Sequence, residues 1–196
     1  MLGVADDTLF VEYVGEIPPV VEEAALELGR WHHRDRSRHR AWHVQDQLAQ
    51  RLAVSELDWS VVDSAPGLAA IWNQRQPLMA RLDALPRCIT HGDFSIGNLR
   101  VDDGGPVDGG VVVIDWATLG FSPVGFDLAH LALAGLNAEL LPIYLEGLQS
   151  RYEPEHVGLG YRTAVSLIGA SRAHWMAIRA MPLPAGYVDF IEAHRP

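Results

Sequence analysis

Three short stretches decide how this chain folds and what chemistry it can support: HGDFSIGN at residues 91–98, VIDW at 113–116 and GFDLA at 125–129. Asp93 follows a strand-like stretch, Asn98 begins the next strand, and Asp115 ends the strand after that. The turn-rich sequence DDGGPVDGG between the last two strands predicts that they form a β-hairpin. Because a hairpin brings its two ends together, we expect Asn98 and Asp115 to face each other.

The side chains in these stretches suit phosphoryl transfer. The amide oxygen of Asn98 and the carboxylate of Asp115 suit Mg²⁺, a hard cation that keeps several waters and takes its other ligands from substrate phosphates. Asp93, just before that site, is placed to accept a proton from an attacking hydroxyl group. Phosphoryl transfer requires a positioning base next to metal ligands of this kind. The residues therefore predict a magnesium site with a base beside it.

Most of the remaining chain has a helical pattern. Apolar residues recur at helical spacing after Pro18 and Pro19, and Gly29 is a mild helix breaker inside that pattern. The other predicted helices cover residues 42–52, 68–85 with a break at Pro77, 125–135, 138–151, 155–181 and 187–193, and the predicted strands cover residues 8–14, 87–90, 98–101 and 111–115. The stretch VVVID at 111–115 is the clearest candidate for a buried strand. We therefore expect a mostly helical α+β fold around a small β-hairpin.

Composition limits the possible functions. The chain has 196 residues, 48% of them hydrophobic, and a formal net charge of −10. At about 150 residues per domain, this length predicts a single domain. All 15 basic residues are arginine, so chemistry that needs a lysine, such as a Schiff base or a phosphate-binding lysine, has no residue for it in this chain. The acidic balance disfavours binding to nucleic acid, which needs a basic surface.

The cysteine count and the apolar stretches indicate the cellular compartment. Cys88 is the single cysteine, which excludes a disulfide framework and a cysteine metal cluster and favours a reducing cytoplasm. The N-terminus lacks the pattern of a signal peptide, and the longest apolar stretches are far shorter than the ~20 residues that a membrane span needs. We therefore expect a soluble cytoplasmic protein with no membrane or nucleic-acid partner.

In this order and spacing, HGDxxxxN, IDW and DLA resemble the aminoglycoside phosphotransferase and choline kinase-like family, which shares the protein-kinase fold. The resemblance implies the C-terminal lobe of that fold, with the small β-hairpin carrying the catalytic loop. It implies that Asp93 is the catalytic base and that Asn98 and Asp115 bind Mg²⁺. It also implies that His91 is a structural residue of the catalytic loop and that Asp127 is a buried acid bracing it. Taken alone, Asp127 is equally well explained as the cap of a helix.

The resemblance also implies an activity. Such an enzyme moves the γ-phosphoryl group of Mg²⁺–ATP or Mg²⁺–GTP to a hydroxyl group of a small polar acceptor, such as an aminoglycoside in antibiotic resistance. The acceptor itself is not specified by these residues, and in this family it can be cationic. Four acidic residues of the C-terminal helices are candidates to recognise an amine on the acceptor: Glu139, Glu146, Asp189 and Glu192.

The resemblance reaches back to the start of the chain. The sequence LFVEYVG at residues 9–15 is similar to the strand and hinge that join the two lobes of such enzymes. Backbone groups of Glu12, Tyr13 and Val14 would there contact the nucleotide base. We therefore divide the chain into a hinge-strand remnant of the N-terminal lobe at residues 1–15 and a helical catalytic and acceptor-binding lobe at 16–196.

A complete member of the family also has a β-rich N-terminal lobe, with a phosphate-covering loop and a lysine that binds the nucleotide phosphates. This sequence starts at the hinge and has no lysine. The glycines of DDGGPVDGG do not replace the missing loop, because they precede a strand and lie among aspartates that would repel phosphate. We therefore expect a truncated form of such a kinase.

Two other interpretations stay open. In the first, the chain is a catalytically inactive, pseudokinase-like domain that only binds a ligand or a protein. In the second, it is a metal-dependent hydrolase that uses His91, Asp93 and Asp115 without a nucleotide. The second is disfavoured, because hydrolytic metal sites usually provide more histidine and carboxylate ligands than these residues do.

Overall fold

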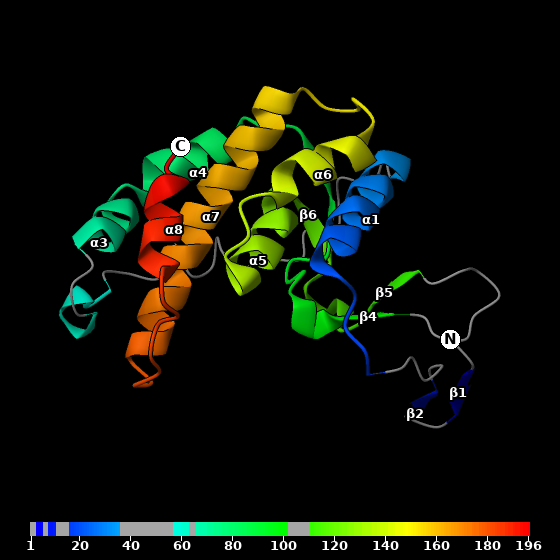
Figure 1. The fold of residues 1–196 in the computed structure, drawn as a ribbon, viewed down its shortest axis with the longest axis horizontal. Coiled ribbons are helices and arrows are strands. Elements are labelled where there is room, and N and C mark those ends of the chain that lie inside the picture. Colours follow the sequence, from blue (N-terminus) through cyan, green and yellow to red (C-terminus); the bar gives the residue numbers. More distant parts are fainter. Residues whose placement is uncertain (1–2, 6–7, 11–15, 36–56, 63–65, 102–109) are drawn as a thin grey trace.

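The computed structural model describes residues 3–5, 8–10, 16–35, 57–62, 66–101 and 110–196. The long helix α7 (Pro154–Ala177) crosses this part of the molecule, and helices pack on two sides of it (Figure 1). On one side lie α3 (Pro66–Asn73), α4 (Arg75–Asp83) and α8 (Tyr187–Ala193). On the other lie α5 (Phe126–Gly135), α6 (Leu140–Leu148) and α1 (Val21–Arg34). The expected mostly helical α+β fold is confirmed.

Helix α1 begins where the sequence predicts, directly after the two prolines. Glu22 and Glu23 lie in its first turn and three basic residues lie in its last turn, so both ends complement the helix dipole. The helix packs against α6 along a glycine contact. A Cβ atom on Gly29 would clash with the carbonyl oxygen of Tyr144, and one on Gly147 with the carbonyl oxygen of Leu26. Gly29, expected to weaken the helix, instead allows the two backbones to approach closely.

The break predicted in the helical pattern at residues 68–85 is present, but three residues earlier than Pro77. Helix α3 ends at Asn73 and α4 begins at Arg75. Pro77 therefore lies in the first turn of α4, where the missing N–H group costs no intrahelical hydrogen bond. The predicted bounds of the last helix agree with α8. The predicted helix at residues 42–52 lies outside the described residues.

The described strands form three antiparallel pairs. Strand β1 (Gly3–Ala5) pairs with β2 (Thr8–Phe10), β3 (Arg87–Thr90) with β6 (Gly120–Pro123), and β4 (Leu99–Val101) with β5 (Val111–Val113). The β4–β5 pair confirms the predicted hairpin, with Leu99 opposite Val113. The expectation of a buried strand at residues 111–115 was wrong. Strand β5 ends at Val113, and its side chains are half-buried because a two-stranded sheet leaves them partly uncovered.

The hydrophobic core lies between α5 and α7 and continues under the β3–β6 pair. Leu128 and Leu131 of α5 and Ala164 and Leu167 of α7 are fully buried. This core supports the loop that follows β3, on which the candidate site lies. Within the described residues, no helix combines the length and the apolar character that crossing a lipid bilayer requires.

Candidate active site

Strand β3 leads directly into the loop that carries HGDFSIGN. His91 is buried, its Nε2 atom lies 2.9 Å from the carbonyl oxygen of Ile114, and its ring stands edge-on to Trp116. Thr118 donates a hydrogen bond of 2.6 Å from its hydroxyl to the His91 carbonyl oxygen. Gly92 has a φ of 83°, and a Cβ atom there would clash with the Thr118 carbonyl oxygen. The loop path therefore requires glycine at this position.

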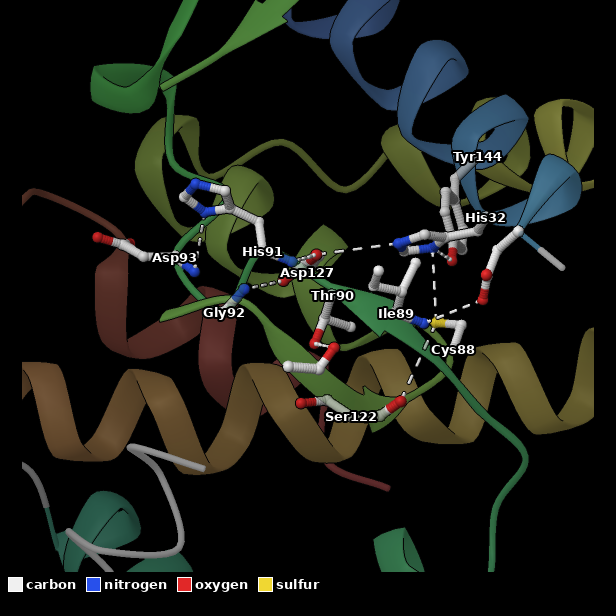
Figure 2. A network of polar contacts seen from close by, with 12 residues as sticks. His32, Cys88, Ile89, Thr90, His91, Gly92, Asp93, Ser122, Asp127 and Tyr144 are labelled. Carbon is white, nitrogen blue, oxygen red and sulfur yellow. Dashed lines mark hydrogen bonds and ion pairs between the residues drawn. The ribbon is translucent and has the colours of Figure 1, made fainter. Parts of the chain in front are cut away.

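Asp127, at the start of α5, lies beside this loop, and Figure 2 shows its carboxylate directed at the backbone of His91 and Gly92. Its buried carboxylate accepts hydrogen bonds from the backbone N–H groups of His91 at 2.7 Å and Gly92 at 2.9 Å. Burial raises the pKa of the Asp127 carboxyl group, and the Gly92 N–H group, His130 and His91 oppose that shift. The carboxylate makes no capping hydrogen bond at the start of α5. Asp127 thus contacts the backbone of the loop.

A second buried residue, His32 at the end of α1, lies on the side of Asp127 that faces away from the loop (Figure 2). Its Nδ1 atom lies 2.6 Å from the hydroxyl group of Tyr144, and its Nε2 atom lies 3.9 Å from the Asp127 carboxylate. Burial lowers the pKa of His32 to about 3, so the ring is neutral. Burial also raises the pKa of the Tyr144 hydroxyl group, which therefore stays protonated and can donate to Nδ1. The His32 proton then lies on Nε2, directed toward Asp127.

His32 was not predicted from the sequence, although one signal was present. His32 lies four residues after Leu28, on the apolar stripe of α1 that also holds Ala24 and Ala25. A histidine at a buried position of such a stripe needs polar partners inside the protein. Cys88, expected to be a buried thiol, lies 3.7 Å from His32 Nδ1, and burial raises its pKa, so it is unreactive.

Asp93, the expected base, lies on the exposed side of the loop. The Asn98 amide donates hydrogen bonds to the Asp93 carbonyl oxygen at 2.9 Å and to its carboxylate Oδ2 atom at 3.2 Å. The His130 ring facing the carboxylate lowers the pKa of Asp93, burial opposes that shift, and Arg172 and Asn98 add to it. The side chain keeps 45% of its surface exposed. Asp93 is therefore ionised at neutral pH and accessible to a ligand.

The two expected metal ligands lie at the end of the β4–β5 hairpin. The backbone N–H group of Ile114, the residue before Asp115, donates to the Asn98 carbonyl oxygen at 2.9 Å. With Nδ2 of Asn98 bonded to Asp93, the oxygen side of the amide is the side that can bind a cation. Asp115 has a left-handed backbone with a φ of 59°, and its side chain is exposed.

This arrangement fits a metal with few protein ligands. Among the residues that the structure describes, no group of three or more His, Cys, Asp and Glu side chains is placed to hold a metal ion. An amide oxygen and one carboxylate would leave most coordination positions to waters and phosphates, which is typical of Mg²⁺.

Two residues beside Asp93 were not predicted. The Nδ1 atom of His130, on α5, lies 3.4 Å from the Asp93 Oδ1 atom, and the Arg172 guanidinium, on α7, lies 3.4 Å from the same Nδ1 atom. His130 follows DLA directly and lies one helical turn after Asp127. That spacing places both side chains on one face of α5, which was the available signal.

The acidic residues expected to bind an amine on the acceptor do not form one site. Glu139 directly precedes α6 and Glu146 lies within it. Asp189 and Glu192 belong to α8, on the opposite side of α7 (Figure 1). Glu192 is bonded to Arg195 at 2.8 Å. The hinge residues Glu12, Tyr13 and Val14 lie outside the described residues.

In this helical lobe, the loop after β3 and the β-hairpin present a carboxylate, an amide and a second carboxylate. This arrangement is typical of the large lobe of the protein-kinase-like fold. Solved structures similar to this chain have that fold. One is a choline/ethanolamine kinase family protein from Mesorhizobium loti, with 15% identity, a TM-score of 0.55 and coverage of 89% of this chain and 58% of that chain. Another is LicA in complex with AMP, with 14% identity, a TM-score of 0.59 and coverage of 93% and 66%. A third is the amicoumacin kinase hAmiN in complex with AMP-PNP, Ca²⁺ and Ami, with 14% identity, a TM-score of 0.51 and coverage of 89% and 57%.

The chain belongs to the phosphotransferase enzyme family, whose model matches residues 15–163. This confirms the family that the motifs resemble. A comparison with curated proteins gives no match. The chain spans between 57% and 66% of the length of the three solved structures.

Proposed function

We propose that this chain is the catalytic lobe of a small-molecule kinase that moves the γ-phosphoryl group of Mg²⁺–ATP to a hydroxyl group of a small polar acceptor. The observation that carries the proposal is the position of Asp93. Its carboxylate is ionised and accessible, and it accepts a hydrogen bond from the Asn98 side chain. The backbone of Asn98 is in turn hydrogen-bonded to the residue before Asp115. Base and metal ligands thus form one continuous unit, as phosphoryl transfer requires.

In this mechanism Asp93 orients the acceptor hydroxyl group and accepts its proton as the new oxygen–phosphorus bond forms. The bond between the γ-phosphorus atom and the oxygen that bridges the β- and γ-phosphates breaks, and the nucleoside diphosphate leaves. The oxygen side of Asn98 and the Asp115 carboxylate would hold Mg²⁺, which when bound neutralises charge on the phosphates. Asp127 and His91 keep the loop in the conformation that presents Asp93.

The nucleotide and the acceptor are supported less directly. Two similar structures contain AMP or AMP-PNP, which supports ATP, and GTP is the alternative donor. Choline or ethanolamine, amicoumacin-like compounds and aminoglycosides are the acceptor classes to test, the last with a role in antibiotic resistance. We assign residues 1–15 to the hinge and 16–196 to the catalytic and acceptor-binding lobe, with backbone groups of Glu12, Tyr13 and Val14 on the nucleotide base. The lone buried cysteine and the use of ATP support the cytoplasm as the location.

Transfer of labelled phosphate tests the proposal. The protein is incubated with Mg²⁺ and γ-labelled ATP or GTP and with a panel of aminoglycosides, amicoumacin-like compounds, choline and ethanolamine. We expect one acceptor class to be phosphorylated, and Asp93→Asn to lower kcat by about 10²- to 10⁴-fold. Asp83→Asn, which removes only an exposed pair with Arg87, is the matched control. Turnover of Asp93→Asn close to that of the unchanged protein would contradict the mechanism.

The catalytically inactive, pseudokinase-like domain is the second candidate. One observation favours it: the sequence has no lysine to bind nucleotide phosphates. Calorimetric titration with Mg²⁺–ATP and Mg²⁺–GTP separates the two candidates. Tight binding that depends on Mg²⁺ favours the kinase, whereas the absence of binding and of transfer favours the inactive domain.

A further inference from the structure

Helix α5 contacts the catalytic loop at two successive positions of one face. Asp127, in its first turn, binds the backbone N–H groups of His91 and Gly92. One turn later, His130 lies against the side chain of Asp93, with Nδ1 3.4 Å from Oδ1. The helix therefore reaches both the backbone of the loop and the carboxylate that the loop presents.

The His130 ring is itself fixed in place. Its side chain is only 11% exposed, and the Phe126 ring from the previous turn lies 5.6 Å away. The Arg172 guanidinium approaches from α7 to 3.4 Å from Nδ1. Among the described residues no carboxylate lies within 4 Å of Arg172, so the guanidinium is not held by an ion pair.

We propose that His130 is a positioning residue for Asp93: the Nδ1–H group of His130 donates to Oδ1 of Asp93, while the Asn98 amide donates to Oδ2. The two donors approach the carboxylate from the hairpin side and from α5, so its rotation is restricted. The catalytic consequence of this arrangement rests on the proposed kinase function. Contacts of this kind are often long in the absence of substrate and shorten in the reacting complex.

The charges around Nδ1 decide where the ring proton lies. Nδ1 is within 3.4 Å of a carboxylate oxygen and of a guanidinium nitrogen, so it cannot satisfy both at once. Without a proton, Nδ1 accepts from Arg172, and Oδ1 of Asp93 receives no hydrogen bond from the ring. With a proton, it donates to a full negative charge, and such charge-assisted hydrogen bonds are about twice as strong as neutral ones. Arg172 has other N–H groups and can turn one toward Asp93 or solvent.

A purely structural role for His130 makes different predictions. A core histidine could be replaced by leucine with an effect on stability alone. A positioning residue needs a donor at the place of Nδ1. The amide nitrogen of asparagine lies near the position of Nδ1, whereas that of glutamine lies near Nε2. His130→Asn should therefore keep the function, and His130→Gln and His130→Leu should lose it.

The first experiment reads the ring directly and does not depend on catalysis. A two-bond ¹H–¹⁵N NMR spectrum of protein with ¹⁵N-labelled histidine, at pH 8, shows which ring nitrogen carries the proton. The His130 signal is assigned by its loss in His130→Asn. We expect a protonated Nδ1 in the unchanged protein and a shift toward protonated Nε2 in Asp93→Leu, in which Nδ1 is free to accept from Arg172. A bare Nδ1 in the unchanged protein would overturn the proposal.

The second experiment measures kcat and KM for whichever nucleotide and acceptor the panel identifies. We expect His130→Gln and His130→Leu to lower kcat about 10- to 100-fold with both KM values nearly unchanged, as for a misplaced catalytic group. His130→Asn should keep kcat within about threefold of the unchanged protein. Thermal unfolding of all variants shows whether a lower kcat is caused by loss of the fold. His156→Asn, at an exposed position at the start of α7, is the control. Equal loss in His130→Asn and His130→Gln, or no loss in either, would refute the positioning role.

The two experiments distinguish failure of the inference from failure of the proposed function. If Asp93→Asn is inactive and the His130 variants are not, the kinase proposal stands and the positioning role falls. If no transfer is seen with the unchanged protein, the kinase proposal fails, and the NMR spectrum alone decides whether His130 donates to Asp93.

Discussion

The buried His32 should make the stability of the fold depend on pH in a defined way. Its pKa is about 3 in the folded protein, because burial disfavours the charged ring, whereas an exposed histidine in the unfolded chain has a pKa of about 6.5. Below pH 6.5 the unfolded chain therefore binds a proton at this residue that the folded protein does not bind. His32 thus contributes stability that is complete above pH 6.5 and is lost progressively as the pH falls toward 3.

The size of the effect follows from the two pKa values. Each pH unit below the unfolded pKa lowers the free energy of unfolding by about 1.4 kcal/mol. Between pH 7.5 and pH 5 the loss from His32 is therefore about 2 kcal/mol. The raised pKa of Asp127 acts in the opposite direction, because the folded protein then binds a proton more readily than the unfolded chain. The effect of His32 must accordingly be measured as a difference between variants.

Urea unfolding followed by far-UV circular dichroism, at several pH values from 7.5 to 5, measures that difference. His32→Gln removes the titrating ring and should be less stable than the unchanged protein at pH 7.5, because Tyr144 loses its partner. Its free energy of unfolding should fall by about 2 kcal/mol less across this pH range than that of the unchanged protein. His156→Gln removes an exposed histidine and serves as the control for the loss of one titrating group. If His32→Gln and the unchanged protein show the same slope with pH, the reasoning from burial is refuted.

Two further predictions concern packing and the metal. Gly29→Ala should lower the free energy of unfolding by about 1–3 kcal/mol, because the new Cβ atom would clash with the carbonyl oxygen of Tyr144, whereas Gly135→Ala meets no atom within 4 Å; equal urea midpoints for the two variants would contradict the close approach of α1 and α6. Asp115→Asn should raise the Mg²⁺ concentration needed for half-maximal nucleotide binding at least about tenfold, read from the fluorescence of the neighbouring Trp116, which is 43% exposed; an unchanged midpoint would exclude Asp115 as a metal ligand.

Local signals predicted the parts of the fold that depend on short-range order. Strand β3 and the β4–β5 hairpin have β-branched residues flanked by turn residues, and α1 has prolines before it and an apolar stripe along it. Strand β6 was not predicted because two of its four residues, Gly120 and Pro123, are of types that disfavour strands. It forms because it pairs with β3, which lies about thirty residues earlier in the chain. Such pairing is set by tertiary contacts that a local pattern does not contain.

The candidate site likewise combines residues that local sequence predicts with residues that only tertiary packing brings together. Asp93, Asn98 and Asp115 were predicted from their spacing, and the structure brings the backbone of Asn98 against the residue before Asp115. The partners that surround Asp93 were not predicted. His130 and Arg172 belong to two different helices, and their approach to Asp93 depends on how α5 and α7 pack. An individual histidine or arginine on a helix gives no sign of which neighbour it will meet.

The contacts that fix the proposed base all come from the described part of the large lobe. The backbone of the loop is bound by Asp127, which His32 contacts in turn. The Asp93 carboxylate lies between Asn98 and His130. Among the described residues, the partners of Asp93 are therefore not residues that bind the nucleotide phosphates, a role for which this sequence has no lysine. We therefore predict that the arrangement around Asp93 forms without bound nucleotide. A protonated Nδ1 on His130 in a chain that transfers no phosphate would show that the base half of the site forms by itself.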